Sequence, residues 1–351
     1  MIRHDPTCAV IERREMVLAV SGLTKRFGTS TPLFARLWKV ADRVVLAAAD
    51  VSFTIERGRT LALVGESGCG KSTVARCIAG ILTPTAGTIL FMGVDMAKQP
   101  ADRAVRRHLQ MIFQDPYASL NPRWRVGRIV AEPIRTHGLL SSRLRIEERV
   151  VELLCQVGLS AGDAGRYPHE FSGGQRQRIS IARALASEPD FIVCDEPTSA
   201  LDVSIQAQIL NLMRGLQERL RLTYLLISHN LSVVAHMADT IAVMYLGRLV
   251  EIGDASDILD RPLHPYTRML LEAVPDIEMT GRRRQLHIGE APSPFAPPAG
   301  CAYHPRCPLA NERCARERPH AVEFAGVRVA CHAVTEGRID TGPAHTTLKP
   351  Q

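Results

Sequence analysis

The sequence predicts an α/β protein built on a largely parallel sheet. Short apolar runs such as Thr60–Val64, Phe191–Cys194 and Tyr224–Ile227 are each bounded by turn or charge signals. Between about Met16 and Val274, such runs alternate with longer helical patterns. Continuous apolar runs of this length, spaced by helices, are typical of parallel strands that are buried on both faces.

The composition narrows the class of protein. The chain has 351 residues, more than one ordinary domain, of which 46% are hydrophobic and 23% charged. These fractions exclude a disordered, collagenous or coiled-coil protein. No apolar run reaches the roughly 18 residues of a membrane-spanning helix, and the first residues show no secretory signal. We therefore expect a soluble cytosolic protein whose nine cysteines are free thiols or metal ligands.

The net charge of +7 suits phosphate ligands, nucleic acid or an anionic membrane surface. A motif that follows the Thr60–Val64 run favours phosphate ligands. Gly65-Glu66-Ser67-Gly68-Cys69-Gly70-Lys71-Ser72 matches G-x-x-x-x-G-K-[ST] in full, between a strand and a helical pattern. The glycines allow backbone N–H groups to surround phosphate oxygens, Lys71 reaches the β- and γ-phosphates, and Ser72 can ligate Mg²⁺. A glycine-rich turn with an incidental lysine is the alternative. Strand, loop and helix together predict that Gly65–Thr73 binds a nucleotide, and the loop alone does not give the class of NTPase.

Cys69 lies where this loop meets the start of the helix. A helix N-terminus stabilises a thiolate, so we expect the pKa of the Cys69 thiol to be lowered. Alkylation of this thiol would then inhibit ATP binding. A small residue chosen only for its fit is the alternative.

The strand that begins at Phe191 ends in the acidic pair Asp195-Glu196. At the C-terminal end of a parallel strand, Asp195 would face a metal ion beside the phosphate loop. Glu196 could then polarise a water molecule for attack on the γ-phosphate. Such a pair alone is more often a solvated turn, but the upstream phosphate loop makes it a candidate catalytic site.

A second candidate anion site is Phe171-Ser172-Gly173-Gly174-Gln175, which opens a helical pattern through Arg176–Ala186. One domain has no need of two such sites for a single ATP. With these motifs the chain resembles the ATP-binding-cassette (ABC) ATPases, whose signature is L-S-G-G-Q; Phe171 in place of Leu changes a packing residue. The resemblance implies that two cassettes face head to tail, so that the signature of each caps the ATP held by the other's phosphate loop.

The resemblance implies a P-loop NTPase (RecA-like) ABC ATPase core, with an N-terminal antiparallel β-subdomain, a helical subdomain and an irregular Cys/Pro-rich C-terminal module. The expected units are a disordered lead-in at 1–15, the ABC ATPase domain at 16–274 with its helical subdomain at about 115–170, an oligopeptide-transporter-type C-terminal module at 275–335, and a tail at 336–351.

Roles for further residues follow from the same resemblance. Gln114 would contact Mg²⁺ and water and sense a transmembrane partner, and His229 would contact the γ-phosphate. Asp202 would lie at the dimer interface, and Phe27 is the candidate that stacks on adenine. The implied catalytic residues are Glu196, His229 and Gln114; the implied Mg²⁺ ligands are Ser72, Gln114 and Asp195.

Three further stretches are similar to the oligopeptide, dipeptide and nickel importer branch of this family. They are Gln114–Pro122, Tyr167–Glu170, and the C-terminal stretch with His264–Thr267, Gly289–Pro294 and Gly300–Pro308. The insertion before Val51 is similar to the second of the two ATPases that such importers carry.

The branch implies a subunit that binds and hydrolyses ATP to energise import of peptides. Its partners would be a second ABC ATPase subunit (identical or homologous), two transmembrane permease subunits and an extracytoplasmic solute-binding protein. It would lie peripherally on the cytoplasmic side of the cell (inner) membrane. A soluble cassette ATPase acting on nucleic acid, in repair or translation, is the alternative. The single cassette and the position of the cysteines after it argue against that alternative, so we expect no nucleic-acid partner.

Prolines crowd the C-terminal module, which excludes a long helix or a central strand there. Cys301, Cys307, Cys314 and Cys331 fit no common zinc-finger spacing. The resemblance implies a [4Fe–4S] cluster on these thiolates; structural zinc and reduced, unliganded thiols remain as alternatives. We expect no part of this module to reach the ATP chemistry.

Overall fold

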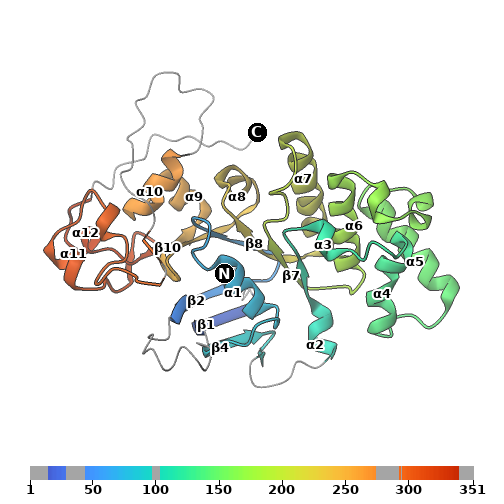
Figure 1. The fold of residues 1–351 in the computed structure, drawn as a ribbon, viewed down its shortest axis with the longest axis horizontal. Coiled ribbons are helices and arrows are strands. Elements are labelled where there is room, and N and C mark those ends of the chain that lie inside the picture. Colours follow the sequence, from blue (N-terminus) through green and yellow to red (C-terminus); the bar gives the residue numbers. More distant parts are fainter. Residues whose placement is uncertain (1–14, 29–43, 97–102, 274–291, 294, 340–351) are drawn as a thin grey trace, which may run out of the picture.

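The computed structural model describes residues 15–28, 44–96, 103–273, 292–293 and 295–339 (Figure 1). The expected lead-in except its last residue, the insertion at 29–43, the Gly289–Ala291 part of the proline-rich stretch and the end of the tail lie outside these residues. The described chain is a mixed α/β fold with two sheets.

The central sheet has eight strands, in the order β11-β12-β10-β9-β3-β8-β7-β6. The five strands from β9 to β6 pair in parallel, and the pairs β9–β10, β10–β12 and β12–β11 are antiparallel. Every residue of β3, β7 and β8 is buried, as the continuous apolar runs predict. The strands are β3 (Thr60–Val64), β6 (Leu109–Ile112), β7 (Phe191–Asp195), β8 (Thr223–Ser228), β9 (Thr240–Tyr245), β10 (Arg248–Asp254), β11 (Val322–Phe324) and β12 (Val327–Val329).

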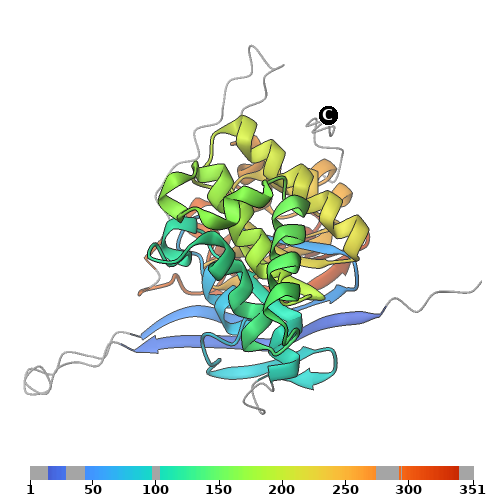
Figure 2. The ribbon, with the colours of Figure 1, turned by 90° about the vertical axis from the view of Figure 1, so that its right-hand side faces the viewer.

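The second sheet is antiparallel, with strand order β2-β1-β4-β5, and lies beneath the helices in Figure 2. It packs against one face of the central sheet. Alternation along β7 shows this arrangement: Phe191 and Val193 join the core with the antiparallel sheet, whereas Ile192 and Cys194 join the core with the helices. Its strands are β1 (Met16–Gly28), β2 (Val44–Glu56), β4 (Ala86–Phe91) and β5 (Val94–Asp95).

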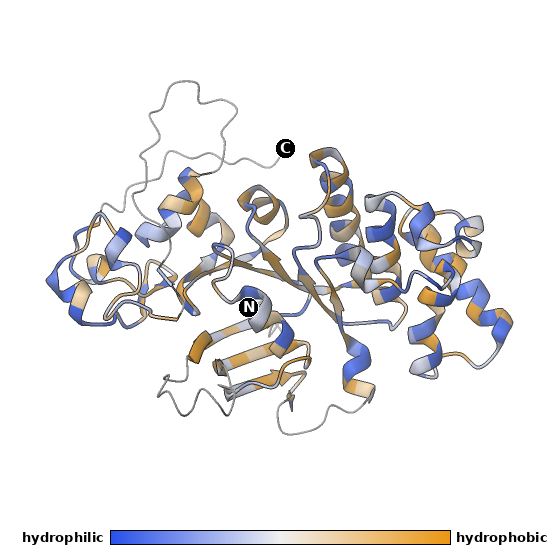
Figure 3. Cartoon of the chain, viewed as in Figure 1, coloured by the Kyte–Doolittle hydropathy of each residue, from blue (hydrophilic) through white to orange (hydrophobic). Residues whose placement is uncertain are grey.

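Helices cover the other face, and a helical part occupies one end of the long axis (Figure 1). Hydrophobic residues concentrate on the central strands, and hydrophilic residues lie on the outer helices (Figure 3). The helices up to the C-terminal module are α1 (Lys71–Ile78), α2 (Arg103–His108), α3 (Pro116–Ser119), α4 (Val126–Thr136), α5 (Arg143–Gln156), α6 (Gly173–Leu185), α7 (Val203–Leu220), α8 (Leu231–Met237), α9 (Ala255–Asp260) and α10 (Pro265–Glu272), with short 3-10 turns η2 (Ala161–Gly165) and η3 (Pro168–Glu170).

The C-terminal module lies at the opposite end from α4 and α5 (Figure 1). It contains η4 (His304–Arg306), α11 (Glu312–Arg316), β11, β12 and α12 (His332–Thr335). The expectation that this stretch is irregular is wrong for 322–335, because β12 pairs with β10 and extends the central sheet. Its apolar residues share one core with β3 and α10, so the module is packed onto the ATPase domain. The unit boundaries drawn from the sequence remain predictions.

Candidate active site

The phosphate loop joins β3 to α1, and two of its glycines are required by the space around them. Gly65 has φ +150°, and a Cβ there would lie 2.2 Å from the carbonyl oxygen of Met244. Gly70 has φ +109°, and a Cβ there would lie 1.9 Å from the carbonyl oxygen of Ala47. Any side chain at either position would displace β9 or β2, so the loop depends on both glycines.

Lys71 begins α1 and is 4% exposed. Its ammonium donates to the carbonyl oxygens of Gly65 (2.7 Å) and Glu66 (2.9 Å), and so lies across the start of the loop. A cavity of about 410 Å³ opens over this loop. Its lining comprises Val45–Ala47, Ser67–Thr73, Gln114, Glu196, His229, Leu246 and Gly247. The structure therefore brings Ser67–Thr73 of the predicted ATP-binding residues together with the three predicted catalytic residues at the carboxyl ends of the parallel strands.

A hydroxyl and a carboxylate meet at the base of the loop. The Ser72 hydroxyl donates to Oδ1 of Asp195 at 2.8 Å, joining the first turn of α1 to the end of β7. Burial raises the pKa of Asp195, and the hydrogen bond from Ser72 and the charges of Arg76 and Lys71 partly oppose this rise. Two hard oxygen ligands beside a phosphate site suit Mg²⁺.

Glu196 lies at the meeting point of three strand ends. Its Oε2 is 3.2 Å from Nε2 of Gln114, which follows β6, and 3.2 Å from Nδ1 of His229, which follows β8. The Glu196 backbone has φ +47°, and its N–H donates to the carbonyl oxygen of Ile227 at 3.0 Å. A non-glycine residue in this left-handed conformation is strained, which is common at active sites. Both contacts fall on one oxygen, and a carboxylate fixed in this way is a candidate acceptor for a proton from water.

The second predicted anion site is a separate place in the described chain. Ser172 caps α6: its hydroxyl accepts from the Gln175 N–H, and the Gln175 side chain accepts from the Ser172 N–H. Phe171 is buried, and a Cβ on Gly174 would lie 2.4 Å from Cγ2 of Ile205. None of Ser172–Gln175 lines the cavity over the phosphate loop, and Asp202, before α7, is exposed.

Phe27, the candidate for adenine, lies near the end of β1 and is 40% exposed. It pairs with Val45 of β2, which lines the cavity, while Phe27 itself is not among the lining residues. The ammonium of Lys25 lies 5.2 Å from its ring centroid. Adenine stacking by Phe27 remains a prediction.

The expected lowering of the Cys69 pKa is wrong. The side chain is 5% exposed, and loss of solvation raises the pKa of the thiol more than the nearby charge of Lys71 lowers it. The stabilisation of a thiolate by a helix N-terminus does not prevail here, because the Cys69 thiol belongs to the hydrophobic core.

Sequence analysis missed a contact between the phosphate loop and the C-terminal module. The guanidinium of Arg306, in η4, binds both carboxylate oxygens of Glu66 at 2.9 Å. The module therefore contacts the phosphate loop, but none of its described residues lines the cavity over that loop, and the expectation that it does not reach the ATP chemistry stays a prediction. The two residues are 240 positions apart, and no local pattern in the sequence marks either as a partner of the other.

The four module cysteines form no disulfide. The N–H of Cys301 donates to the carbonyl oxygen of Cys314 at 2.8 Å. Burial, together with the charges of Cys331, Cys301 and Cys314, raises the pKa of Cys307 to about 11. Within the described residues, no three His, Cys, Asp or Glu side chains are grouped to hold a metal ion. Neither iron–sulfur nor zinc binding is supported by this arrangement.

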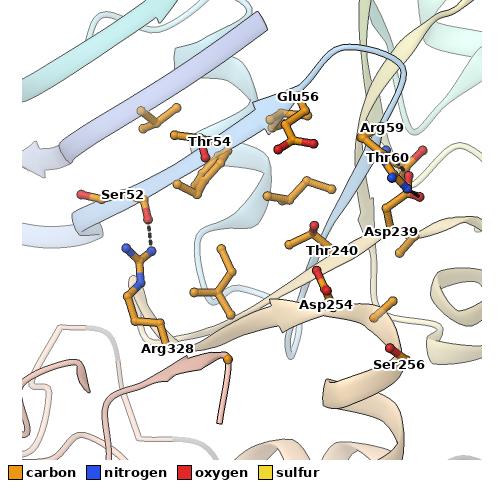
Figure 4. A pocket seen from close by; sticks show the side chains of 18 of the residues that line it. Ser52, Thr54, Glu56, Arg59, Thr60, Asp239, Thr240, Asp254, Ser256 and Arg328 are labelled. Carbon is orange, nitrogen blue, oxygen red and sulfur yellow. Dashed lines mark hydrogen bonds and ion pairs between the residues drawn. The ribbon is translucent and has the colours of Figure 1, made fainter. Parts of the chain in front are cut away.

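The cavity in Figure 4, about 780 Å³, lies away from the phosphate loop, between β2 and the central sheet. Two of the charged groups that line it make contacts: Arg328 donates to the carbonyl oxygen of Ser52, and Arg59 binds Asp239 at 2.6 Å. The first contact joins β12 to β2, and thus the central sheet to the antiparallel sheet. The second joins the turn before β3 to the start of β9 within the central sheet.

None of the described helices is long and apolar enough to cross a membrane. Two family patterns match the chain: "ABC transporter" at residues 48–199 and "oligopeptide/dipeptide transporter, C-terminal region" at residues 250–314. The ABC transporter cassette MJ0796, solved as a dimer, is 26% identical with a TM-score of 0.59, over 68% of this chain and 98% of that one. The fold and the site therefore define this chain as an ABC-type ATPase, which binds and hydrolyses ATP.

Similarity to full-length relatives identifies the family. The chain is 50% identical over 326 residues to the oligopeptide transport ATP-binding protein AppF of Bacillus subtilis, covering 91% of this chain and 98% of the relative. It is 49% identical over 321 residues to the di/tripeptide transport ATP-binding protein DppF of Pseudomonas aeruginosa, with the same coverage. The chain belongs to this family of peptide transport ATP-binding proteins. These relatives do not favour the alternative of a nucleic-acid ATPase.

Proposed function

We propose that this chain energises uptake of di- or oligopeptides by hydrolysing ATP on a peripheral subunit at the cytoplasmic face of the cell membrane. The observation that carries the proposal is near-full-length similarity to peptide transport ATP-binding proteins, including the match of the C-terminal region. The partners would be a second cassette, two permease subunits and a solute-binding protein.

In this proposal, Ser72, Gln114 and Asp195 would hold the Mg²⁺ of MgATP, and Lys71 would leave the carbonyl oxygens of Gly65 and Glu66 to bind the β- and γ-phosphates. Gln114 and His229 orient the carboxylate of Glu196, because both side chains contact its Oε2 atom. Glu196 then takes a proton from the attacking water. Ser172–Gln175 lie outside the cavity over the phosphate loop of their own chain. In the proposal, they therefore close the site of the facing cassette over its γ-phosphate.

The helical part offers a route from a permease to this site. Gln114 directly precedes Asp115, which caps α3 by accepting from the Tyr117 N–H at 2.7 Å. Helix α3 in turn contacts α6: the guanidinium of Arg176 stacks 3.8 Å from the Tyr117 ring centroid, and Arg183 binds the carbonyl oxygen of Ser119. A displacement of α3 would therefore reach both Glu196, through Gln114, and the signature on α6.

The [4Fe–4S] cluster on Cys301, Cys307, Cys314 and Cys331 is a finer part of the proposal. It rests on the resemblance and on the four cysteines of a small module. The described side chains are not themselves grouped to hold a metal ion, and structural zinc on the same thiols is the alternative. Anaerobically purified protein should absorb broadly at roughly 400 nm, as Cys₄-ligated clusters do. Colourless, metal-free protein with an intact fold would remove this part.

Reconstitution tests the main proposal. The chain would be assembled with a second cassette, permease subunits and a solute-binding protein of the same organism, in proteoliposomes supplied with MgATP. Labelled dipeptides and oligopeptides should accumulate and should stimulate phosphate release, and neither effect should occur with Glu196→Gln. Stimulation by Ni²⁺ or by DNA, with no response to any peptide, would contradict the proposal.

A further inference from the structure

The phosphate loop is held from outside by the C-terminal module. Arg306 and Glu66 form a bidentate ion pair, with Nη1 and Nη2 each 2.9 Å from one carboxylate oxygen. The Arg306 side chain is 9% exposed and the Glu66 side chain 29% exposed. Two parallel charge-assisted bonds in a mostly buried place fix the orientation of both groups more strongly than a surface pair does.

A cluster of three tyrosines surrounds this ion pair. Tyr245, Tyr266 and Tyr303 are each buried, with ring centroids 4.6, 5.3 and 5.4 Å apart. They come from β9, from α10 and from the residue before η4, so the ATPase domain and the module meet here. The Tyr266 hydroxyl accepts from the Glu66 N–H at 2.8 Å. Both the side chain and the backbone of Glu66 are therefore anchored by residues outside the loop.

The anchored residue is also a partner of the phosphate-binding lysine. The carbonyl oxygen of Glu66 accepts from the Lys71 ammonium at 2.9 Å. Contacts thus run without a break from Arg306 through Glu66 to Lys71. If Glu66 turned, this carbonyl and the neighbouring N–H groups of the loop would turn with it.

Charge gives the pair a second effect. Glu66 places a carboxylate in a loop that must accept a polyanionic triphosphate, and like charges at close range weaken binding. The guanidinium of Arg306 neutralises that carboxylate at 2.9 Å. Loss of Arg306 would therefore loosen the loop and expose the nucleotide to an uncompensated negative charge.

We propose that Arg306 is a positioning residue for ATP binding, through which the folded C-terminal module keeps the phosphate loop in its nucleotide-accepting form. Arg306 does not touch the reacting atoms in this account. It acts through Glu66, and its effect is on the affinity for MgATP. The inference concerns the ATP site alone and stands whether or not the transported solute is a peptide.

The test is MgATP affinity of the full-length chain, measured by calorimetry in the hydrolysis-deficient Glu196→Gln background. Arg306→Ala should weaken binding about tenfold, the loss expected for a hydrogen-bonded charged pair. Arg306→Lys, which retains the charge but not the fork, should weaken it about threefold. The matched control is Arg313→Ala in the same module. Among the described residues Arg313 forms ion pairs with Glu317 and Glu336, away from the phosphate loop, so this variant should bind MgATP as the parent does.

A double variant separates the effect of charge from a general defect. Arg306→Ala/Glu66→Gln removes the uncompensated carboxylate and should bind MgATP more tightly than Arg306→Ala alone. In the hydrolytically active chain, Arg306→Lys should raise KM for ATP with kcat changed less than twofold. Parent-like affinity in folded Arg306→Ala, or equal losses in Arg306→Ala and Arg313→Ala, would overturn the proposal. If Arg306→Ala does not fold, Arg306→Lys and the double variant provide the test. Parent-like MgATP affinity in both of these variants would overturn the proposal.

Discussion

The side-chain amide of Gln114 donates to the Glu196 carboxylate at 3.2 Å, and this contact joins the candidate base to the start of the helical part of the chain. The same carboxylate oxygen faces His229 at 3.2 Å. One atom of Glu196 is thus in contact with the two residues whose strands flank its own. Any movement of the segment between β6 and α3 changes the surroundings of that atom.

Gln114→Ala should therefore uncouple hydrolysis from its regulation. Without the amide, Glu196 keeps its His229 contact, so basal ATP hydrolysis by the assembled transporter should fall less than about tenfold. Stimulation of that hydrolysis by the solute should be lost, because the link to α3 is broken. Phosphate release measured with and without solute checks this, and normal stimulation in the variant would contradict it.

Ser172→Arg should abolish hydrolysis in the assembled transporter while leaving nucleotide binding by the isolated chain intact. Ser172 lies outside the cavity over its own phosphate loop, so a bulky cation there would obstruct only a composite site between two cassettes. Nucleotide affinity of the isolated chain and phosphate release by the complex are the two readouts. Loss of affinity in the isolated chain would contradict the head-to-tail arrangement.

Cys69 should react slowly with alkylating reagents, since its thiol is buried and its pKa is raised. Cys155, on α5, is exposed and should be modified before Cys69. Peptide mapping by mass spectrometry during iodoacetamide treatment at pH 8 gives the order directly. Modification of Cys69 ahead of Cys155 in the folded, nucleotide-free chain would show that the loop opens more readily than this structure indicates.

Glu251 should give the free energy of unfolding a distinctive pH dependence. It is 1% exposed, and burial raises its pKa to about 7, from 4.5 in an unfolded chain. The folded state therefore keeps a proton that the unfolded chain loses, and the contribution of Glu251 is complete below pH 4.5 and is lost as the pH rises through 7. Its neighbour His264, with a pKa lowered to about 3, acts oppositely: its contribution is present above 6.5 and is lost as the pH falls.

The pH dependences that Glu251 and His264 give to the free energy of unfolding oppose each other. Comparison of the parent with Glu251→Gln isolates the contribution of the Glu251 carboxyl group. The advantage of the parent over this variant should be largest near pH 4.5 and should shrink up to pH 7, by at most about 1.4 kcal/mol per pH unit. Chemical denaturation at a series of pH values measures it, with exposed Glu312→Gln as the control. A difference that does not vary with pH would show that Glu251 is ionised when folded.

The sequence predicted those parts of the site that a local motif encodes. The phosphate loop, the Asp195-Glu196 pair and the Ser172 cap each follow from neighbouring residues and the period of the strands. The Arg306–Glu66 pair was not predictable, because only the tertiary fold brings together residues 240 positions apart. The Cys69 prediction failed because a helix-end rule ignores how deeply the thiol is buried, and β12 was missed because its partner, β10, is distant in sequence.

The most direct test of the central claim, that Glu196 is the base for ATP hydrolysis in this site, is single-turnover release of γ-phosphate. The assembled transporter would carry either the parent chain or Glu196→Gln, with MgATP affinity measured in parallel. The amide cannot accept the proton of water, so release should fall by at least about 10²-fold while affinity stays within twofold. Release at the parental rate in the Gln variant would contradict the account.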